Sequence, residues 1–244
     1  MNVNQERIPV IIPSYEPDAR LVSLLEKLVD AGIKNIVIVD DGSGEDYKEY
    51  FETAKNKFHA QVIVHDKNRG KGAALKTAFR FCIENIPDLI GCITADSDGQ
   101  HSPECILKVM ESLEKNPSEL IMGSRDFTQP GVPKMSAFGN RNTNKIIKTV
   151  YKKDLKDTQT GLRGLPKAFM SDCLGIKGDR FEFEIKMLCL ALEKEIGIEE
   201  VPIKTIYDSE KNHATHFNPF LDTVKIYRSL GFFKSIGIIL FGKK

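Results

Sequence analysis

Residues 8–43, IPVIIPSYEPDARLVSLLEKLVDAGIKNIVIVDDGS, carry the pattern that decides the fold. The apolar run Ile8–Pro13 predicts a strand. The segment Asp18–Ala31 predicts a helix, because its leucines at positions 21, 24, 25 and 28 fall on one face. The β-branched run Ile36–Val39 predicts a second strand. A strand, a helix and a strand in this order indicate parallel strands joined by a right-handed crossover.

The same alternation continues downstream. Further strands are expected at Val62–His65, Cys92–Ala95, Leu120–Gly123 and Ile198–Ile203, and helices at Asp46–Phe58, Gly70–Asn85, Pro103–Lys115, Asn142–Tyr151 and Phe183–Lys194. The stretch Asp157–Gly164 is expected to be irregular. We therefore predict an α/β fold with a Rossmann-like, mostly parallel sheet and helices on both faces.

We expect residues 1–206 to form one domain, and residues 207–244 to form a lid loop and a C-terminal amphipathic helical tail. The segment Phe220–Phe241 places apolar side chains along one stripe, which suits a helix in a membrane interface or one packed on the domain. No run of about 18 apolar residues and no export leader is recognised, so a cytoplasmic protein is expected.

The bulk composition excludes several classes of function. A net charge of +1 in 244 residues gives no overall attraction to nucleic acid. The five cysteines are odd in number and none forms a C-x-x-C pair, so a structural zinc site is not expected.

Polar residues follow the predicted strands, and in such sheets ligands bind beyond the carboxyl ends of the strands. Asp96-Ser97-Asp98 places two carboxylates where both can approach one hard cation, Mg²⁺ or Mn²⁺. Asp40 and Asp41 end a strand, where carboxylates can accept hydrogen bonds from a base N–H or from ribose hydroxyls. Arg69 and Lys71 stand at a glycine-rich helix start, which suits a phosphate contact. Taken singly, each of these motifs also fits an ordinary turn or helix cap.

Together the motifs resemble family 2 glycosyltransferases, especially the dolichol-phosphate mannose synthase and polyprenyl-phosphate sugar synthase branch. The matching segments, in chain order, are PSYE (13–16), VDDGS (39–43), NRGKGAA (68–74), DSDGQH (96–101), GSR (123–125), DTQTGLR (157–163), FEFE (181–184) and VPI (201–203).

The resemblance implies a GT-A fold, a nucleotide-sugar donor and a divalent metal. It implies that Pro13, Tyr15, Glu16 and Asp41 hold the nucleoside, that Asp96 and Asp98 hold the metal and diphosphate, and that Gln100 lies near the metal. The family usually has Asn before the Glu of the first motif, whereas Tyr15 stands there in this chain.

The acceptor side is inferred from charge. Arg125, Arg141 and Arg163 lie in or beside matched motifs, and we expect their guanidinium groups to converge over the site and bind a lipid phosphate. A hydroxyl acceptor needs a general base, for which Glu182, Glu184 or Asp157 could serve. With a phosphate acceptor these carboxylates would orient Arg163 or the donor sugar.

The sequence therefore predicts an inverting, metal-dependent glycosyltransferase that is peripheral on the cytoplasmic face of a membrane. It would transfer a sugar from a UDP- or GDP-sugar to a polyprenyl phosphate, with a homo-oligomer or a membrane partner subunit possible. The alternatives are transfer to a saccharide hydroxyl, a sugar-nucleotide pyrophosphorylase and a nucleotide-sugar-binding regulatory subunit.

Overall fold

The computed structural model of the chain describes residues 5–129 and 134–204. The expected lid loop and amphipathic tail, residues 207–244, lie outside the described residues, so both stay predictions. Within the described part, no helix is long and apolar enough to cross a bilayer.

The centre of the fold is a seven-stranded sheet with the order β3-β2-β1-β4-β6-β5-β7. Its strands are β1 (Val10–Ser14), β2 (Ile36–Asp40), β3 (Gln61–Val64), β4 (Gly91–Thr94), β5 (Leu120–Arg125), β6 (Arg163–Pro166) and β7 (Ile198–Ile203). All neighbouring strands run parallel except β6, which is antiparallel to both β4 and β5. The predicted α/β fold with a mostly parallel sheet is confirmed.

Strand β6 was not expected, because the sequence RGLP has neither an alternating pattern nor strong strand formers. It forms because the gap between β4 and β5 offers partners on both sides. Arg163 lies opposite Thr94 on β4 and Met122 on β5. The tertiary context overrides the weak local preference.

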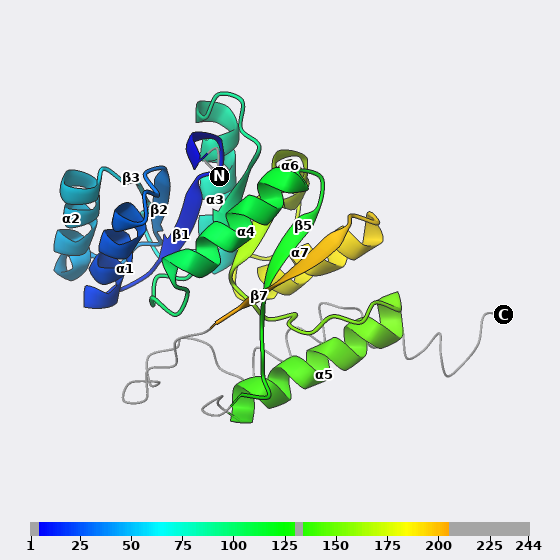
Figure 1. Cartoon of the computed structure of the whole chain (residues 1–244). Coiled ribbons are helices and arrows are strands. Elements are labelled where there is room, and N and C mark those ends of the chain that lie inside the picture. Colours follow the sequence, from blue (N-terminus) through cyan, green and yellow to red (C-terminus); the bar gives the residue numbers. More distant parts are fainter. Residues whose placement is uncertain (1–4, 130–133, 205–244) are drawn as a thin grey trace.

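Helices cover the sheet (Figure 1). They are α1 (Ala19–Asp30), α2 (Lys48–Phe58), α3 (Lys71–Asn85), α4 (Pro103–Lys115), α5 (Lys134–Tyr151), α6 (Lys167–Cys173) and α7 (Glu182–Glu193), with short 3₁₀ turns η1 (Gln5–Arg7) and η2 (Glu45–Tyr47). Ser102 caps α4 by accepting a hydrogen bond from the Cys105 N–H, and Pro103 opens the helix, both as expected.

Helix α5 begins at Lys134, eight residues before the expected start at Asn142. Gly139 and Asn140 are weak helix formers, which hides this first part from a sequence reading. Tertiary contacts compensate: the Asn140 side chain donates to the Lys156 carbonyl at 2.7 Å and accepts from the Thr158 N–H at 3.0 Å.

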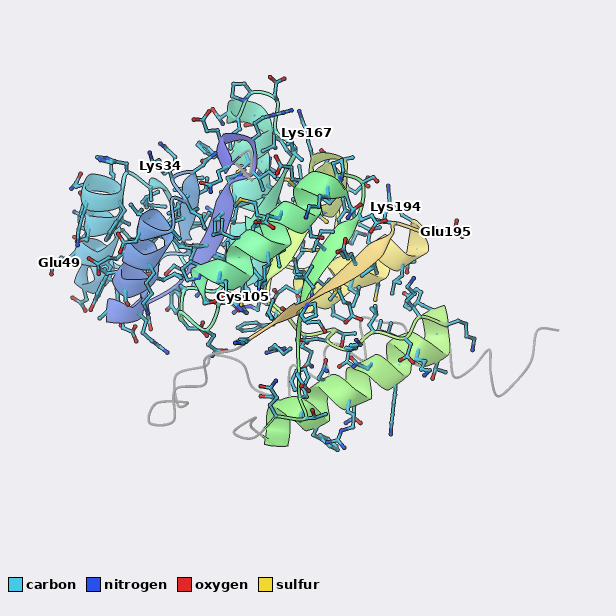
Figure 2. All side chains as sticks on the ribbon, in the orientation of Figure 1. Lys34, Glu49, Cys105, Lys167, Lys194 and Glu195 are labelled. Carbon is cyan, nitrogen blue, oxygen red and sulfur yellow. The ribbon has the colours of Figure 1, made fainter. Side chains whose placement is uncertain are left out.

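Two cores form on the two faces of the sheet because successive strand residues point to opposite sides. In β1, Ile11 packs with α3, α6 and α7, whereas Val10 and Ile12 pack with α1, α2 and α4. The outer helix surfaces carry charge, as Glu49 of α2 and Lys167 of α6 show (Figure 2). Helix α5 lies beyond the carboxyl end of β5, apart from the two helix layers (Figure 1).

Candidate active site

Asp96 lies just after β4 and binds Lys71, a half-buried lysine at the start of α3. Lys71 Nζ is 2.7 Å from Asp96 Oδ1 and 2.8 Å from Glu184 Oε2, a residue of α7. Burial alone would raise the pKa of Asp96, but the charge of Lys71 lowers it well below its ordinary value. The ammonium group thus keeps Asp96 ionised and fixes its orientation.

Asp98 is less stabilised as an anion. Its Oδ1 accepts only the Gln100 N–H at 3.1 Å among the hydrogen bonds found in the described residues. Burial, and then the neighbouring charge of Asp96, raise the pKa of Asp98. A cation between the two carboxylates would offset both effects.

This pair of carboxylates suits Mg²⁺ or Mn²⁺, which are bound through one or two carboxylates together with water and substrate phosphate oxygens. The part of the chain that the structure describes contains no complete group of three or more His, Cys, Asp or Glu side chains able to hold an ion alone. His101 is a further side chain near the carboxylates that could act as a metal ligand. Its Nε2 is 3.9 Å from Asp96 Oδ2, and its buried Nδ1 has no hydrogen-bond partner in the described structure.

A loop closes over Asp96 from the side of β6. A Cβ atom on Gly161 would come 2.4 Å from Asp96 Oδ2, so this close approach needs glycine. The loop is held in place by Thr94, whose hydroxyl donates to the Gly161 carbonyl at 2.8 Å.

The same loop begins at Asp157, which is completely buried and forms a bidentate pair with Arg125 at the end of β5. Arg125 Nε is 2.6 Å from Asp157 Oδ2, and its NH2 is 3.0 Å from Oδ1. The suggestion that Asp157 serves as a general base is therefore wrong for this arrangement, because a carboxylate enclosed and neutralised in this way cannot reach a substrate.

Arg163 does not reach the site surface. It is 1% exposed, and its guanidinium group donates to the backbone carbonyls of Thr160 at 3.0 Å and Glu184 at 2.6 Å. Burial lowers its pKa. The expectation that three arginines converge on an acceptor phosphate is wrong for Arg163, since its donors are used inside the core.

Arg125 and Arg141 do come together. Both line a cavity of about 690 Å³ between the end of β5 and α5, with Arg141 exposed on the helix. The cavity is lined by Ser124, Arg125, Asp126, Phe127, Thr128, Ala137, Asn140, Arg141, Asn144, Lys156, Glu200 and Pro202. Three of these side chains are cationic and two are anionic, and one of the cations, Arg125, is paired with Asp157, so the charges around the cavity balance.

The residues expected to contact the nucleoside lie at the ends of β1 and β2. Pro13 is buried in β1, Tyr15 is half-buried and Glu16 is exposed. Glu16 adopts a left-handed backbone with φ of 49°, and its N–H donates to the Ser43 hydroxyl at 2.8 Å. Left-handed non-glycine residues cost energy and cluster at functional sites.

The two carboxylates after β2 differ in their surroundings. Asp40 accepts the Ser43 N–H at 2.9 Å, while Asp41 accepts the backbone N–H groups of Arg69 and Gly70 at 2.9 and 2.7 Å. The Arg69 guanidinium group turns outward to the exposed Asp66 at 2.6 Å. Only the backbone of Arg69 therefore takes part in this arrangement.

The sequence reading missed His65. It is buried directly after β3, with Nδ1 2.7 Å from Asp41 Oδ1 and Nε2 2.9 Å from the Thr77 hydroxyl. The available signal was its position as a polar residue at the carboxyl end of an apolar strand. His101, although quoted as part of a motif, was likewise given no role.

The chain is similar to known proteins in sequence and in fold. Residues 10–172 match the profile of Glycosyl transferase family 2. The chain is 31% identical over 243 residues to the UDP-N-acetylglucosamine–dolichyl-phosphate N-acetylglucosaminyltransferase of Methanococcus voltae, covering 91% of this chain and 94% of the relative. It is 29% identical over 205 residues to the dolichol-phosphate mannosyltransferase of Pyrococcus furiosus, covering 80% of this chain and 55% of that protein.

Among solved structures, glucosyl-3-phosphoglycerate synthase from Mycobacterium tuberculosis, in complex with Mn²⁺, uridine diphosphate and glucosyl-3-phosphoglycerate, superposes with a TM-score of 0.68. It is 12% identical and the match covers 94% of this chain and 83% of that one, so the likeness concerns the GT-A fold. The family profile spans most of the chain, and the predicted resemblance to polyprenyl-phosphate sugar transferases is confirmed. The chain belongs to glycosyl transferase family 2.

Proposed function

We propose that this protein is an inverting glycosyltransferase that moves a sugar from a UDP- or GDP-sugar to a polyprenyl phosphate. It would act as a peripheral protein on the cytoplasmic face of a membrane and use Mg²⁺ or Mn²⁺. Asp96 and Asp98 would hold the ion, with Gln100 beside them. The ion, when bound, would stabilise the negative charge of the departing diphosphate.

One observation carries this proposal: the loop 157–161 touches both halves of the site. Its Gly161 packs against Asp96, and its Asp157 binds Arg125 at the edge of the cavity between β5 and α5. A donor diphosphate at Asp96 and an acceptor anion in the cavity would therefore lie on either side of one short loop. Arg141 and Lys156 on the cavity wall suit a phosphate, because cationic side chains form charge-assisted hydrogen bonds with phosphate oxygens.

The carboxylates also favour an anionic acceptor. Asp157 is fully buried against Arg125, and Glu184 is paired with Lys71 at 2.8 Å. Two of the three candidate bases are therefore occupied, and a saccharide hydroxyl would have to use Glu182, half-buried at the start of α7. A phosphate is already ionised and can attack without a base. In this proposal Lys71 and Glu184 position Asp96, and Arg125 and Arg141 bind the acceptor.

The test is a transfer assay on the full chain with Mn²⁺ and labelled UDP- and GDP-sugars. The acceptors would be a short-chain polyprenyl phosphate, the corresponding polyprenol and a soluble oligosaccharide. We expect product from the phosphate alone, loss of product in excess chelator, and an inverted anomeric configuration by NMR. Product from the oligosaccharide but not from the phosphate would support the saccharide-hydroxyl alternative and refute the lipid assignment.

The membrane part of the proposal has a separate test. We expect the protein to co-sediment with anionic vesicles, less at high salt, and deletion after Asn218 to abolish this binding. Equal sedimentation of the full and shortened chains would contradict the assignment of the anchor to the tail.

A further inference from the structure

The carboxylate of Glu200, on β7, holds the start of the loop that connects the two halves of the site. Its Oε1 accepts the backbone N–H of Lys156 at 2.8 Å and that of Asp157 at 3.2 Å. The Ser124 hydroxyl donates to the same oxygen at 3.2 Å. Glu200 also lines the cavity between β5 and α5. A single oxygen therefore ties the loop to β5 and β7 at the wall of this cavity.

The two residues that Glu200 holds determine where cations stand around the cavity. Lys156 is itself part of the cavity wall. Asp157 binds the Arg125 guanidinium group through both oxygens, at 2.6 and 3.0 Å. A shift of the backbone at these two positions would therefore move an ammonium group directly and a guanidinium group through its carboxylate partner.

The other side of the same segment is held by α5. Asn140 donates to the Lys156 carbonyl at 2.7 Å and accepts the Thr158 N–H at 3.0 Å. Asn144 donates to the same Lys156 carbonyl at 2.8 Å. These contacts do not involve Glu200, so they would keep the loop folded in a variant at position 200. Loss of the Glu200 acceptor would then displace the cations instead of unfolding the loop.

We infer, on the basis of the proposed function, that Glu200 is a positioning residue for binding of the acceptor phosphate. It fixes the backbone of Lys156 and, through Asp157, the guanidinium group of Arg125. The negative charge of Glu200 works against this role, because an anion on the cavity wall repels a phosphate. The length of the side chain, which brings Oε1 to the two N–H groups, and its charge therefore have opposite effects on acceptor binding, and substitutions can separate them.

Transfer kinetics on the full chain, with Mn²⁺ and saturating nucleotide sugar, separate the two effects. Glu200→Asp keeps the charge but withdraws the carboxylate by one carbon, so the KM for a short-chain polyprenyl phosphate should rise at least about fivefold, the effect of weakened hydrogen bonds. Glu200→Gln keeps the acceptor oxygen and removes the charge, so this KM should equal that of wild type or fall. Glu200→Ala loses both and should behave like Glu200→Asp.

A positioning role differs from a general structural one in what stays unchanged. In the three variants kcat should remain within about twofold of wild type, and so should the Kd of UDP or GDP, because only acceptor binding is affected. The matched control is Glu199→Asp, the same shortening one residue earlier in β7. Glu199 accepts the Asn116 side-chain amide at 2.8 Å, and neither residue lines the cavity, so the KM for the acceptor should not change.

The outcomes separate this inference from the proposed function. An unchanged KM in Glu200→Asp, or a lower KM in Glu200→Ala, would overturn the positioning role while leaving the transferase proposal in place. A raised KM in Glu200→Gln would overturn it as well, because the acceptor oxygen is kept there. If circular dichroism shows that Glu200→Asp does not fold, Glu200→Ala carries the same test. Absence of transfer to the polyprenyl phosphate by wild type would overturn the proposed function itself.

Discussion

Replacing Lys71 by Met tests the electrostatic centre of the site. Lys71 is the shared partner of Asp96 at 2.7 Å and Glu184 at 2.8 Å. A charge-assisted hydrogen bond contributes about 1.5–3 kcal/mol, and breaking a fully buried ion pair costs about 3–5 kcal/mol. The side chains of Lys71, Asp96 and Glu184 are 19%, 33% and 16% exposed, so water would solvate part of the negative charge that the variant leaves unpaired. We therefore expect Lys71→Met to lower the free energy of unfolding by about 2–3 kcal/mol.

A double variant identifies the cause of this loss. In Lys71→Met/Glu184→Gln one of the two unpaired carboxylates is gone, and we expect roughly 1 kcal/mol to be recovered relative to additive effects. Urea unfolding followed by circular dichroism measures both variants, with unchanged dependence on urea concentration as the sign of an unchanged unfolding process. Lys48→Met is the matched control, because its pair with Glu45 is 63% and 88% exposed and should matter little.

The pH dependence follows from the directions of the pKa shifts. The pKa of Lys71 is raised, so its contribution is present below its ordinary value of 10.5 and is lost only at more alkaline pH. The pKa of Asp96 is lowered, so its contribution is present above its ordinary value of 3.8 and is lost as the pH falls. The difference in the free energy of unfolding between wild type and Lys71→Met should thus be independent of pH near neutrality and should decrease in acid. A loss below about 0.5 kcal/mol at pH 7, or strictly additive effects in the double variant, would refute the reasoning.

Three further variants test other parts of the site. Asp98→Asn should reduce transfer by at least ~100-fold, about 3 kcal/mol of transition-state stabilisation. Its control is Asp30→Asn, an exposed residue at the C-terminal end of α1, which should leave transfer unchanged. Because the pKa of Asp98 is raised, its ionised form destabilises the fold. Asp98→Asn should therefore unfold at a higher urea concentration than wild type at pH 7, and this gain in stability should disappear in acid. Lower stability of the variant at pH 7 would contradict this reasoning. Arg141→Ala should raise the KM for polyprenyl phosphate at least ~10-fold, because a charge-assisted contact of about 1.5–3 kcal/mol is lost. Nucleotide binding should not change. Lys145→Ala, at an exposed position of the same helix, is the control. Arg163→Met should instead cost about 3 kcal/mol of stability by leaving buried carbonyls unpaired, and a stable variant with only an acceptor defect would show that its placement in the core is wrong.

The sequence by itself determined the frame of the molecule and the edge at which chemistry occurs. The leucines of α1 and the β-branched run of β2 repeat with helix and strand periods, and such local patterns survive any tertiary arrangement. They place Asp40, Asp41, Asp96 and Asp98 at the carboxyl ends of their strands, which the structure confirms. The order of the motifs was also sufficient to predict the family.

Tertiary structure alone decided how those polar groups are used. Asp157 and Arg163 lie close together in the chain in a matched motif, yet Asp157 neutralises Arg125 and Arg163 supports backbone carbonyls in the core. Strand β6 exists because β4 and β5 offer it hydrogen bonds on both sides. His65 becomes the partner of Asp41 only when β3 is laid beside β2. The physical reason is common to all three: the free energy of a polar group depends on its partners and its access to water, and residues far apart in the sequence supply both.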